Sequence, residues 1–213
     1  MAAKKRAKRP SRAGVPYKKS EATRELLITT AIQLIAKRGL APTSIADIAE
    51  AAGVSKGAVH YYFESKDDLY AKVLVKCCDV LEERIIRVFL GGDFAPLERV
   101  RHALAEMWSV RRDGVAEMRV LTELHMYARQ DPPLRQALAE MLRRARRQVI
   151  DTGLGNLMAM GIKPKIDAAL IPRLLIGTLD GLAIHHEVDP ISASEEPELL
   201  RAIEVMAVSL FEV

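Results

Sequence analysis

Residues 43–66 read TSIADIAEAAGVSKGAVHYYFESK, and this stretch decides the fold of the chain. Its first half predicts a short amphipathic helix, because four apolar residues recur at intervals of three and four, namely Ile45, Ile48, Ala49 and Ala52. Either Thr43 or Ser44 is expected to cap this helix, since a hydroxyl accepts a hydrogen bond from an unpaired backbone N–H. Gly53 follows at the position where a left-handed residue ends a helix.

A second short helix is expected to begin after Ser55, and its two sides differ in chemistry. The inward side is apolar and aromatic, with Val59, Tyr62 and Phe63. The outer side offers a cation, an imidazole, a phenol and small residues, namely Lys56, His60, Tyr61, Gly57 and, at its edge, Ala58. Such a surface suits base edges and phosphates. Two crossed helices joined by a glycine turn can place the second in a DNA major groove, so residues 44–63 are interpreted as a helix-turn-helix motif.

A third helix is expected to start after Ser65, with Asp67 and Asp68 in its first turn, where the helix dipole favours negative charge. Lys66 is the exception in this turn. A cation at the positive end of a helix is better explained if a phosphate lies nearby. The sequence therefore predicts that Lys66 contacts a nucleic-acid backbone.

Other classes of protein compete with this interpretation. One alternative is a plain three-helix subdomain whose polar face is only solvated, and another is a nonspecific architectural DNA binder, which the large apolar C-terminal part disfavours. An enzyme is not expected, because the sequence has no Gly-rich phosphate loop, no His-Glu-x-x-His and no Cys-x-x-Cys. Five scattered His and two adjacent Cys define no metal site, so we expect neither a metal nor a cofactor.

The charge of the chain is unevenly distributed. The net charge is +4, yet residues 1–20 contain eight basic side chains and no acidic one, so the remainder is near −4. Residues 1–19 are therefore expected to form a disordered basic arm beside the motif. Such an arm can follow phosphates or enter a minor groove, or it can act only as a solubilising tail.

Helical periodicity extends over most of the 213 residues, and no sustained strand alternation is present. The sequence predicts an all-α protein with nine helices, three in the N-terminal part and six in a larger C-terminal part. Beyond the motif, the predicted helices cover about 21–37, 66–90, 95–111, 114–129, 132–160, 166–187 and 195–212. The helix from 66 to 90 begins in one part and ends in the other, and so links them rigidly.

The last two predicted helices are apolar nearly all round, above all residues 168–184. A surface helix has one apolar stripe, so these helices must be covered on several sides. Burial within one chain is an alternative, but a second copy of the chain completes the cover and gives a two-fold homodimer. Pro172 is expected to bend its helix or to lie near its start.

The sequence also bears on cellular location. Charged residues at Arg173 and Asp180 interrupt the most apolar run, which argues against a membrane span. The basic N-terminus is not followed by the apolar segment of a secretory signal. Cys77 and Cys78 point about 100° apart on a helix, which suits neither a mutual disulfide nor a metal site, and two thiols fit a reducing compartment. We therefore expect a cytoplasmic protein.

Residues 20–80 resemble the N-terminal DNA-binding domain of the TetR family of bacterial transcriptional regulators. The resemblance is carried by Thr43, Ser44, Ile45, Ile48, Ala49, Ala52, Gly53, Val54, Ser55, Gly57, Tyr61, Phe63, Ser65, Lys66 and Leu69. It implies a helix-turn-helix DNA-binding domain at 20–66 and an effector-binding and dimerisation domain at 67–213. It also implies a dimer formed through a four-helix bundle of the last two helices of each protomer. The chain departs from the usual pattern at His60, where many members carry Tyr, and at Tyr62, where many carry His.

The predicted function is that of a ligand-responsive transcriptional regulator, and specifically a repressor that a small molecule releases from a palindromic operator in double-stranded DNA. Bases are expected to be contacted by Lys56, Gly57 and His60, with Ala58 beside them. Phosphates are expected to be contacted by Thr43, Ser44, Tyr61, Tyr62 and Lys66. The resemblance implies an effector pocket among the helices after the fourth, where Met residues are frequent, although ordinary packing explains them equally well. The candidates for its lining are Trp108, His125, Met126 and Arg129.

Overall fold

The computed structural model describes residues 21–91 and 94–212, and within these residues the chain is all-α apart from one pair of two-residue strands. The predicted basic arm, 1–19, lies outside the described residues. The N-terminal elements are α1 (Glu21–Arg38), α2 (Ile45–Ala51), α3 (Lys56–Tyr62) and α4 (Lys66–Leu90). They are followed by α5 (Pro96–Arg112), α6 (Ala116–Ala128), α7 (Pro132–Val149), the π-helical turn η1 (Ile150–Leu154), α8 (Gly155–Ala159), α9 (Ile171–Val188) and α10 (Glu196–Ser209). The predicted fold class is confirmed.

The start of α2 is fixed by a reciprocal pair of hydrogen bonds. The Ser44 hydroxyl oxygen accepts from the Asp47 backbone N–H at 3.2 Å, and the Asp47 carboxylate accepts from the Ser44 N–H at 2.8 Å. The hydrogen bonds from Ser44 lower the pKa of Asp47. Of the two expected caps, Ser44 is therefore the one used. Gly53 ends the turn after α2 with φ of +68°, the left-handed conformation predicted for it.

One continuous apolar core joins the N-terminal helices to the rest of the molecule. It contains buried residues of α1 to α4 together with residues of α6 and α7. Helix α1 packs on both α4 and α6, and the backbone N–H of Leu40 donates to the Glu123 carboxylate of α6 at 3.2 Å. The DNA-binding and C-terminal domains predicted to meet at residues 66 and 67 therefore share packing across that boundary.

The C-terminal part differs from prediction at its ends. Helices α7, η1 and α8 follow one another without a break, as the predicted helix 132–160 requires. Helix α9, by contrast, begins at Ile171 rather than near 166, and Pro172 lies in its first turn. The last helix ends at Ser209 rather than 212, because β2 (Phe211–Glu212) pairs antiparallel with β1 (Lys163–Pro164). Burial of the Phe211 side chain against Leu154 and Ile171 favours this extended end.

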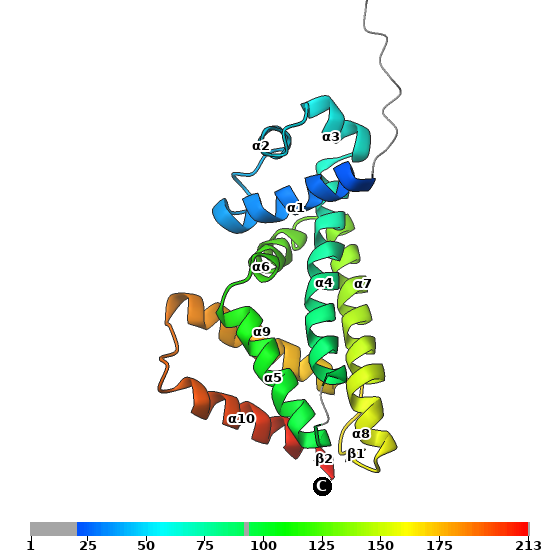
Figure 1. Ribbon diagram of the computed structural model, residues 1–213, viewed down its shortest axis with the longest axis vertical. Coiled ribbons are helices and arrows are strands. Elements are labelled where there is room, and N and C mark those ends of the chain that lie inside the picture. The colour runs from blue at the N-terminus through cyan, green and yellow to red at the C-terminus, as the bar shows by residue number, and fades with distance from the viewer. Residues whose placement is uncertain (1–20, 92–93, 213) are drawn as a thin grey trace, which may run out of the picture.

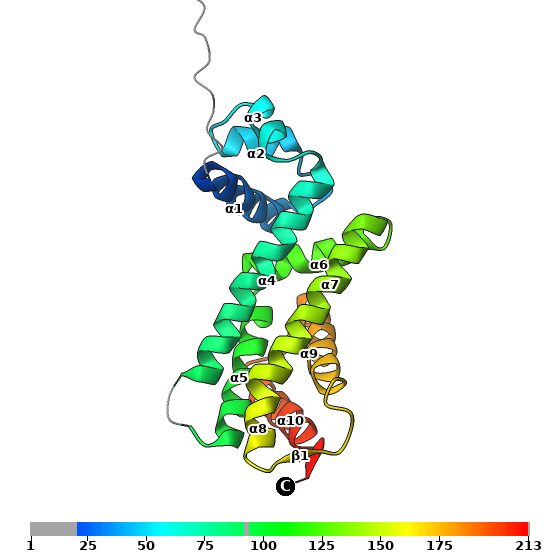
Figure 2. The same ribbon diagram turned by 90° about the vertical axis from the view of Figure 1, so that its right-hand side faces the viewer.

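Figure 1 and Figure 2 show how these elements are arranged. Helices α2 and α3 lie at the end of the molecule opposite β1 and β2. Helices α4 and α7 run beside each other along the C-terminal part, and α9 lies on the far side of α5 in Figure 1. The long helix α4 thus leads directly from the helix-turn-helix to the interior of the C-terminal part.

We predict opposite effects on stability for alanine at the two glycines of the motif. Gly53→Ala forces a side chain into left-handed backbone and is expected to lower the free energy of unfolding by about 1–2 kcal/mol. Gly57→Ala, inside α3 and without steric conflict, is expected to raise it by about 0.5–1 kcal/mol. Urea denaturation followed by circular dichroism measures both; equal effects would contradict the assigned turn.

Candidate nucleic-acid interface and internal cavity

Helix α3 presents the predicted polar face to solvent. Lys56, Gly57, His60 and Tyr61 are exposed, whereas Val59 is buried in the core, as is Phe63 just after the helix. Ala58 and Tyr62 are half-buried, and Tyr62 packs against that core and contacts the Tyr61 ring edge-on at 5.4 Å. The two sides of α3 are therefore those predicted from the sequence, and Lys56, Gly57 and His60 are exposed on the outward side.

Side-chain caps hold the ends of this surface in place. The Ser55 hydroxyl oxygen accepts from the Ala58 N–H at 3.2 Å at the start of α3. The Ser65 hydroxyl oxygen accepts from the Asp68 N–H at 3.1 Å at the start of α4. Each cap fixes the direction in which its helix leaves the turn, so α3 and the first turn of α4 hold a set orientation.

Positive charge on this end of the molecule is available for anions. Within the described residues, neither Lys56 nor Lys66 forms an ion pair with a carboxylate. The Lys66 ammonium lies 5.2 Å from the ring centroid of Tyr70, which is buried and whose pKa burial raises to about 12. This cation–π contact is an intramolecular role for Lys66 that the sequence did not indicate.

Thr43 was predicted to contact a phosphate, and the structure corrects that prediction. Its side chain is 1% exposed, and its hydroxyl donates to the Gly39 carbonyl at 2.7 Å. The hydroxyl links the end of α1 to the start of α2 and cannot reach a ligand in this conformation. Ser44, one residue later, is exposed.

A cavity of about 250 Å³ lies inside the C-terminal part. Its walls come from α4, α5, α6, α7, η1 and α9, and most of the lining side chains are apolar. Helix α4 contributes Cys78, Leu81, Glu82, Ile85 and Ile86. The π-helical turn widens the end of α7 at this wall, a distortion that often accompanies functional sites.

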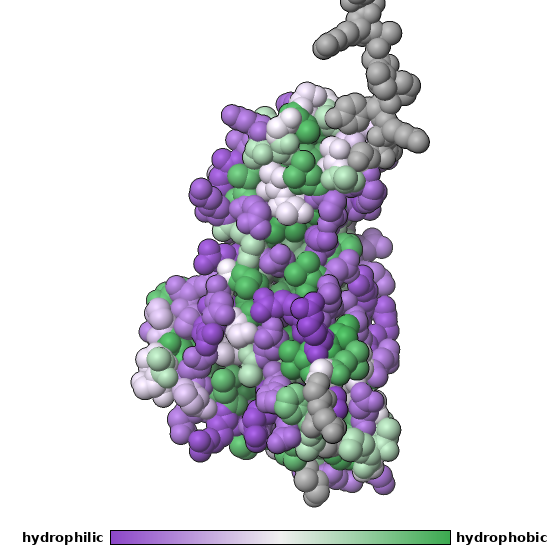
Figure 3. Space-filling model, in the orientation of Figure 1, coloured by the Kyte–Doolittle hydropathy of each residue, from purple (hydrophilic) through white to green (hydrophobic). Residues whose placement is uncertain are grey.

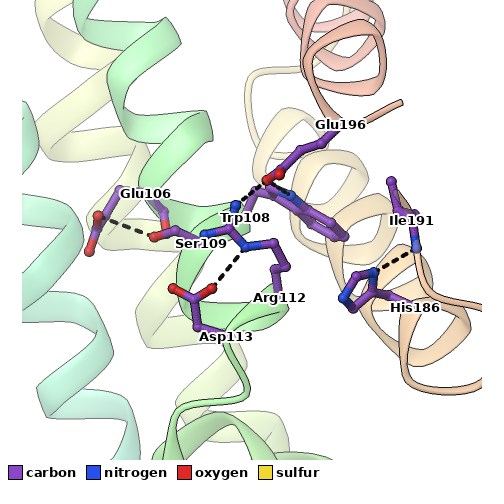
Figure 4. Close-up of polar contacts among 8 residues, drawn as sticks. All are labelled: Glu106, Trp108, Ser109, Arg112, Asp113, His186, Ile191 and Glu196. Carbon is purple, nitrogen blue, oxygen red and sulfur yellow. Dashed lines mark hydrogen bonds and ion pairs between the residues drawn. The ribbon is translucent and has the colours of Figure 1, made fainter. Parts of the chain in front are cut away.

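Two of the four predicted lining residues, His125 and Met126, are part of the cavity wall, and two are not. Arg129 lies exposed at the end of α6, outside the lining. Trp108 is 1% exposed and faces α10 instead, where its indole N–H donates to Glu196 at 2.8 Å (Figure 4). Its position was misjudged because its partner lies 88 residues along the chain.

Glu196 also accepts from the Arg112 guanidinium, so α5 and α10 are held together by two donors on one carboxylate (Figure 4). In the same region the His186 ring accepts from the Ile191 N–H at 3.0 Å, which fixes the turn between α9 and α10. Helix α5 therefore contacts the cavity with one side and α10 with another.

Polar groups in the cavity wall were mostly missed from the sequence. Arg111 donates to Asp180 at 2.8 Å and to the Met107 carbonyl at 2.8 Å, which joins α5 to α9. Glu82 accepts from Arg144 at 3.0 Å. A usable signal existed for Asp180, because it is an acidic residue in the middle of a mostly apolar helix. The sequence around Glu82 and Arg111 gave no such signal.

Cys77 and Cys78 are free thiols, and Cys78 lines the cavity. Burial raises the pKa of both, that of Cys78 to about 12, so neither forms a thiolate readily. Among the residues that the structure describes, no group of three or more His, Cys, Asp and Glu side chains is placed to hold a metal ion. Nor does any described helix combine the length and hydropathy required to cross a membrane.

Helices α9 and α10 carry exposed apolar side chains, including Leu174 at 48%, Ile184 at 52% and Val205 at 63%. On the face of the molecule shown in Figure 3, hydrophobic and hydrophilic side chains are intermixed. The exposed apolar residues of α9 and α10 lie on the two helices that the sequence identified as needing further cover.

Comparisons with known proteins agree over both parts of the chain. Residues 27–73 match the family described as bacterial regulatory proteins, tetR family, and residues 96–208 match the C-terminal domain of BetI-type transcriptional repressors. The chain is 27% identical over 181 residues to the HTH-type transcriptional regulator PksA of Bacillus subtilis, covering 83% of this chain and 84% of PksA.

A probable acrEF/envCD operon repressor of Escherichia coli is 34% identical over 82 residues, which are 38% of this chain and 37% of that protein. The crystal structure of a putative TetR-family regulator from Rhodococcus sp. superposes with a TM-score of 0.72 at 22% identity, over 89% of this chain and all of that one. The fold is therefore shared with that regulator.

Proposed function

Because the chain belongs to the tetR family of bacterial regulatory proteins, we propose that it is a homodimeric repressor that a small molecule releases from a near-palindromic operator. Proteins of this family are DNA-binding transcriptional regulators and not enzymes. The observation that carries the proposal is the exposed polar face of α3, held by the Ser55 cap at one end of the molecule. The protein acts on DNA in the cytoplasm.

At the DNA, Lys56, Gly57 and His60 contact base edges, and Ala58 allows close approach. The side chains of Ser44, Tyr61, Tyr62 and Lys66 contact the phosphates that flank these bases. Thr43 is excluded from this set because its hydroxyl is buried. For Lys66 the bond to phosphate adds to its contact with the Tyr70 ring, which holds the ammonium near the start of α4.

Dimerisation through α9 and α10 places two copies of α3 on one side of the assembly. The support for this interface is the exposure of Leu174 and Val205 on these helices. A two-fold axis then sets the two α3 helices about 34 Å apart, or a small multiple of that distance, to match successive major grooves. This geometry favours a palindromic operator.

Release by a ligand follows from the length of α4. The helix begins at Lys66 beside α3 and carries Leu81, Glu82 and Ile85 in the cavity wall. A ligand that binds one position of α4 more tightly shifts the population toward that position and changes the separation of the two α3 helices. Coupling of this kind is typically about 1–3 kcal/mol.

The proposal predicts that the full-length protein enriches a few genomic fragments with inverted repeats when random DNA competes. Sequencing the bound fragments measures the enrichment. Replacement of His60 with Ala is expected to change which of the repeats are preferred. If random DNA instead abolishes the binding of all fragments equally, the result would indicate a nonspecific architectural DNA binder.

Lys66→Ala is expected to weaken binding to every DNA sequence and to reduce the slope of log affinity against log salt by about one unit. Salt titrations followed by fluorescence anisotropy measure the slope. Lys72→Ala is the matched control, because Lys72 is an exposed lysine on the same helix, farther from α3. An unchanged slope for Lys66→Ala, or an equal reduction for both variants, would argue against a phosphate contact.

Leu174→Arg is expected to convert the dimer into a monomer, because it buries a charge in the proposed interface of α9 and α10. Operator affinity should fall with it, since one protomer contacts only a half-site. Light scattering during gel filtration measures the mass. Leu90→Arg, at a leucine 65% exposed on α4, is the control that should stay dimeric. A dimeric Leu174→Arg variant would place the interface elsewhere.

A further inference from the structure

The carboxylate of Glu82 is the first indication of what the cavity binds. Its side chain is 12% exposed, its Oε2 atom accepts from Arg144, and its buried Oε1 atom has no hydrogen-bond partner among the residues that the structure describes. A buried carboxylate oxygen without a donor is costly, and such exceptions are rare in native proteins. Burial raises the pKa of Glu82, which reflects the same incomplete solvation. A donor from outside the protein would remove this cost.

The other charged groups in the cavity wall also favour a ligand that donates hydrogen bonds. Among the described lining residues the charged side chains are Glu82, Asp180 and Arg111, so the wall has an excess of one negative charge. Arg111 is already engaged, since its Nε donates to Asp180 and its Nη1 to the Met107 carbonyl. The second oxygen of Asp180 accepts no hydrogen bond within the described part of the chain. The described lining residues therefore offer acceptors but no unpaired cation.

His125 adds a further acceptor. Its Nδ1 lies 2.8 Å from the Leu121 carbonyl, so in the neutral ring Nδ1 carries the proton and donates it to that oxygen. The remaining nitrogen, Nε2, then has a free lone pair. His125 is part of the cavity wall together with mostly apolar residues. The wall thus combines a hydrophobic body with several acceptor atoms.

We propose that the cavity binds a small apolar molecule that carries a protonated amine, with Glu82 and Asp180 as the groups that accept from the ammonium. A ligand of charge +1 neutralises the excess negative charge of the wall and supplies the donor that Glu82 lacks. At about 250 Å³ the cavity lies just below the common range for drug-sized ligands, about 300–1,000 Å³, and suits a smaller molecule. The inference rests on the proposed function and names the chemical class of its effector.

The two acceptors, Glu82 and Asp180, lie on different helices, so a bound amine contacts both α4 and α9. Glu82 belongs to α4, which begins beside α3, and Asp180 belongs to α9, which forms the proposed dimer interface. An ammonium bound to Asp180 competes with Arg111 for that carboxylate and so weakens the link between α5 and α9. One ligand group therefore acts on α4, which begins beside α3, and on α9, which belongs to the proposed dimer interface.

The test uses three probes with the same phenylbutyl skeleton and different head groups: phenylbutylamine, phenylbutanol and phenylbutyrate. Isothermal titration calorimetry on the full-length protein without DNA measures each affinity. We expect the amine to bind about tenfold or more tightly than the alcohol, and the carboxylate to bind most weakly. Equal affinities, preference for the carboxylate, or no binding of any probe at millimolar concentration overturns the proposal.

Variants assign the preference to the named groups. Glu82→Gln keeps the shape and removes the charge, and it should weaken amine binding about tenfold while leaving alcohol binding nearly unchanged. Asp79→Asn is the matched control, because Asp79 also pairs with Arg144 but does not line the cavity. Asp180→Asn, at a more exposed site, provides the same test if Glu82→Gln does not fold. An amine affinity unchanged in Glu82→Gln, or in Asp180→Asn where it replaces that variant, overturns the assignment.

Operator binding is measured on the same samples, so that a failure of the proposed effector class can be distinguished from a failure of the proposed regulatory function. If operator binding persists and the amine has no preference, only the effector class is wrong. If the protein binds no specific DNA while the amine preference holds, the regulatory function is wrong and the cavity assignment stands.

Discussion

Helix α4 packs into the N-terminal core with its first half and lines the cavity with its second, and this constraint joins the two ends of the molecule. Its 25 residues span about 37 Å. Leu69, Val73 and Leu74 lie in the core shared with α1, whereas Leu81 and Ile85 line the cavity. A regular helix transmits displacement along its axis because its backbone hydrogen bonds resist bending. Any shift of the cavity wall is therefore felt at the start of α4, next to α3.

A second set of contacts extends this connection to α9 and α10. Helix α5 holds α9 through Arg111 and Asp180, and it holds α10 through Trp108, Arg112 and Glu196 (Figure 4). Both partners are the helices whose exposed apolar residues support the dimer interface. The cavity thus lies between α4, which follows α3, and α9, one of the two helices of the proposed dimer interface.

The features that could be predicted from the sequence depend on neighbours within a few residues. The left-handed Gly53, the Ser55 cap and the inward position of Val59 follow from local rules, and the structure confirms them. The features that were missed depend on distant partners. Trp108 binds Glu196, Phe211 pairs beside Pro164, and six elements build the cavity, so no local pattern could reveal its polar groups. The contacts of Lys56, His60 and Lys66 with DNA stay predictions.

The central claim is that the state of the cavity sets the separation of the two α3 helices. It is tested most directly by pulsed electron paramagnetic resonance on dimers labelled at Glu50→Cys, an exposed site on α2; the native thiols at 77 and 78 are buried. The distance between the two labels is compared before and after Ala145→Trp, which fills the cavity from α7. The account predicts a shifted distance together with altered operator affinity. An identical distance distribution in a folded, cavity-filled dimer would contradict it.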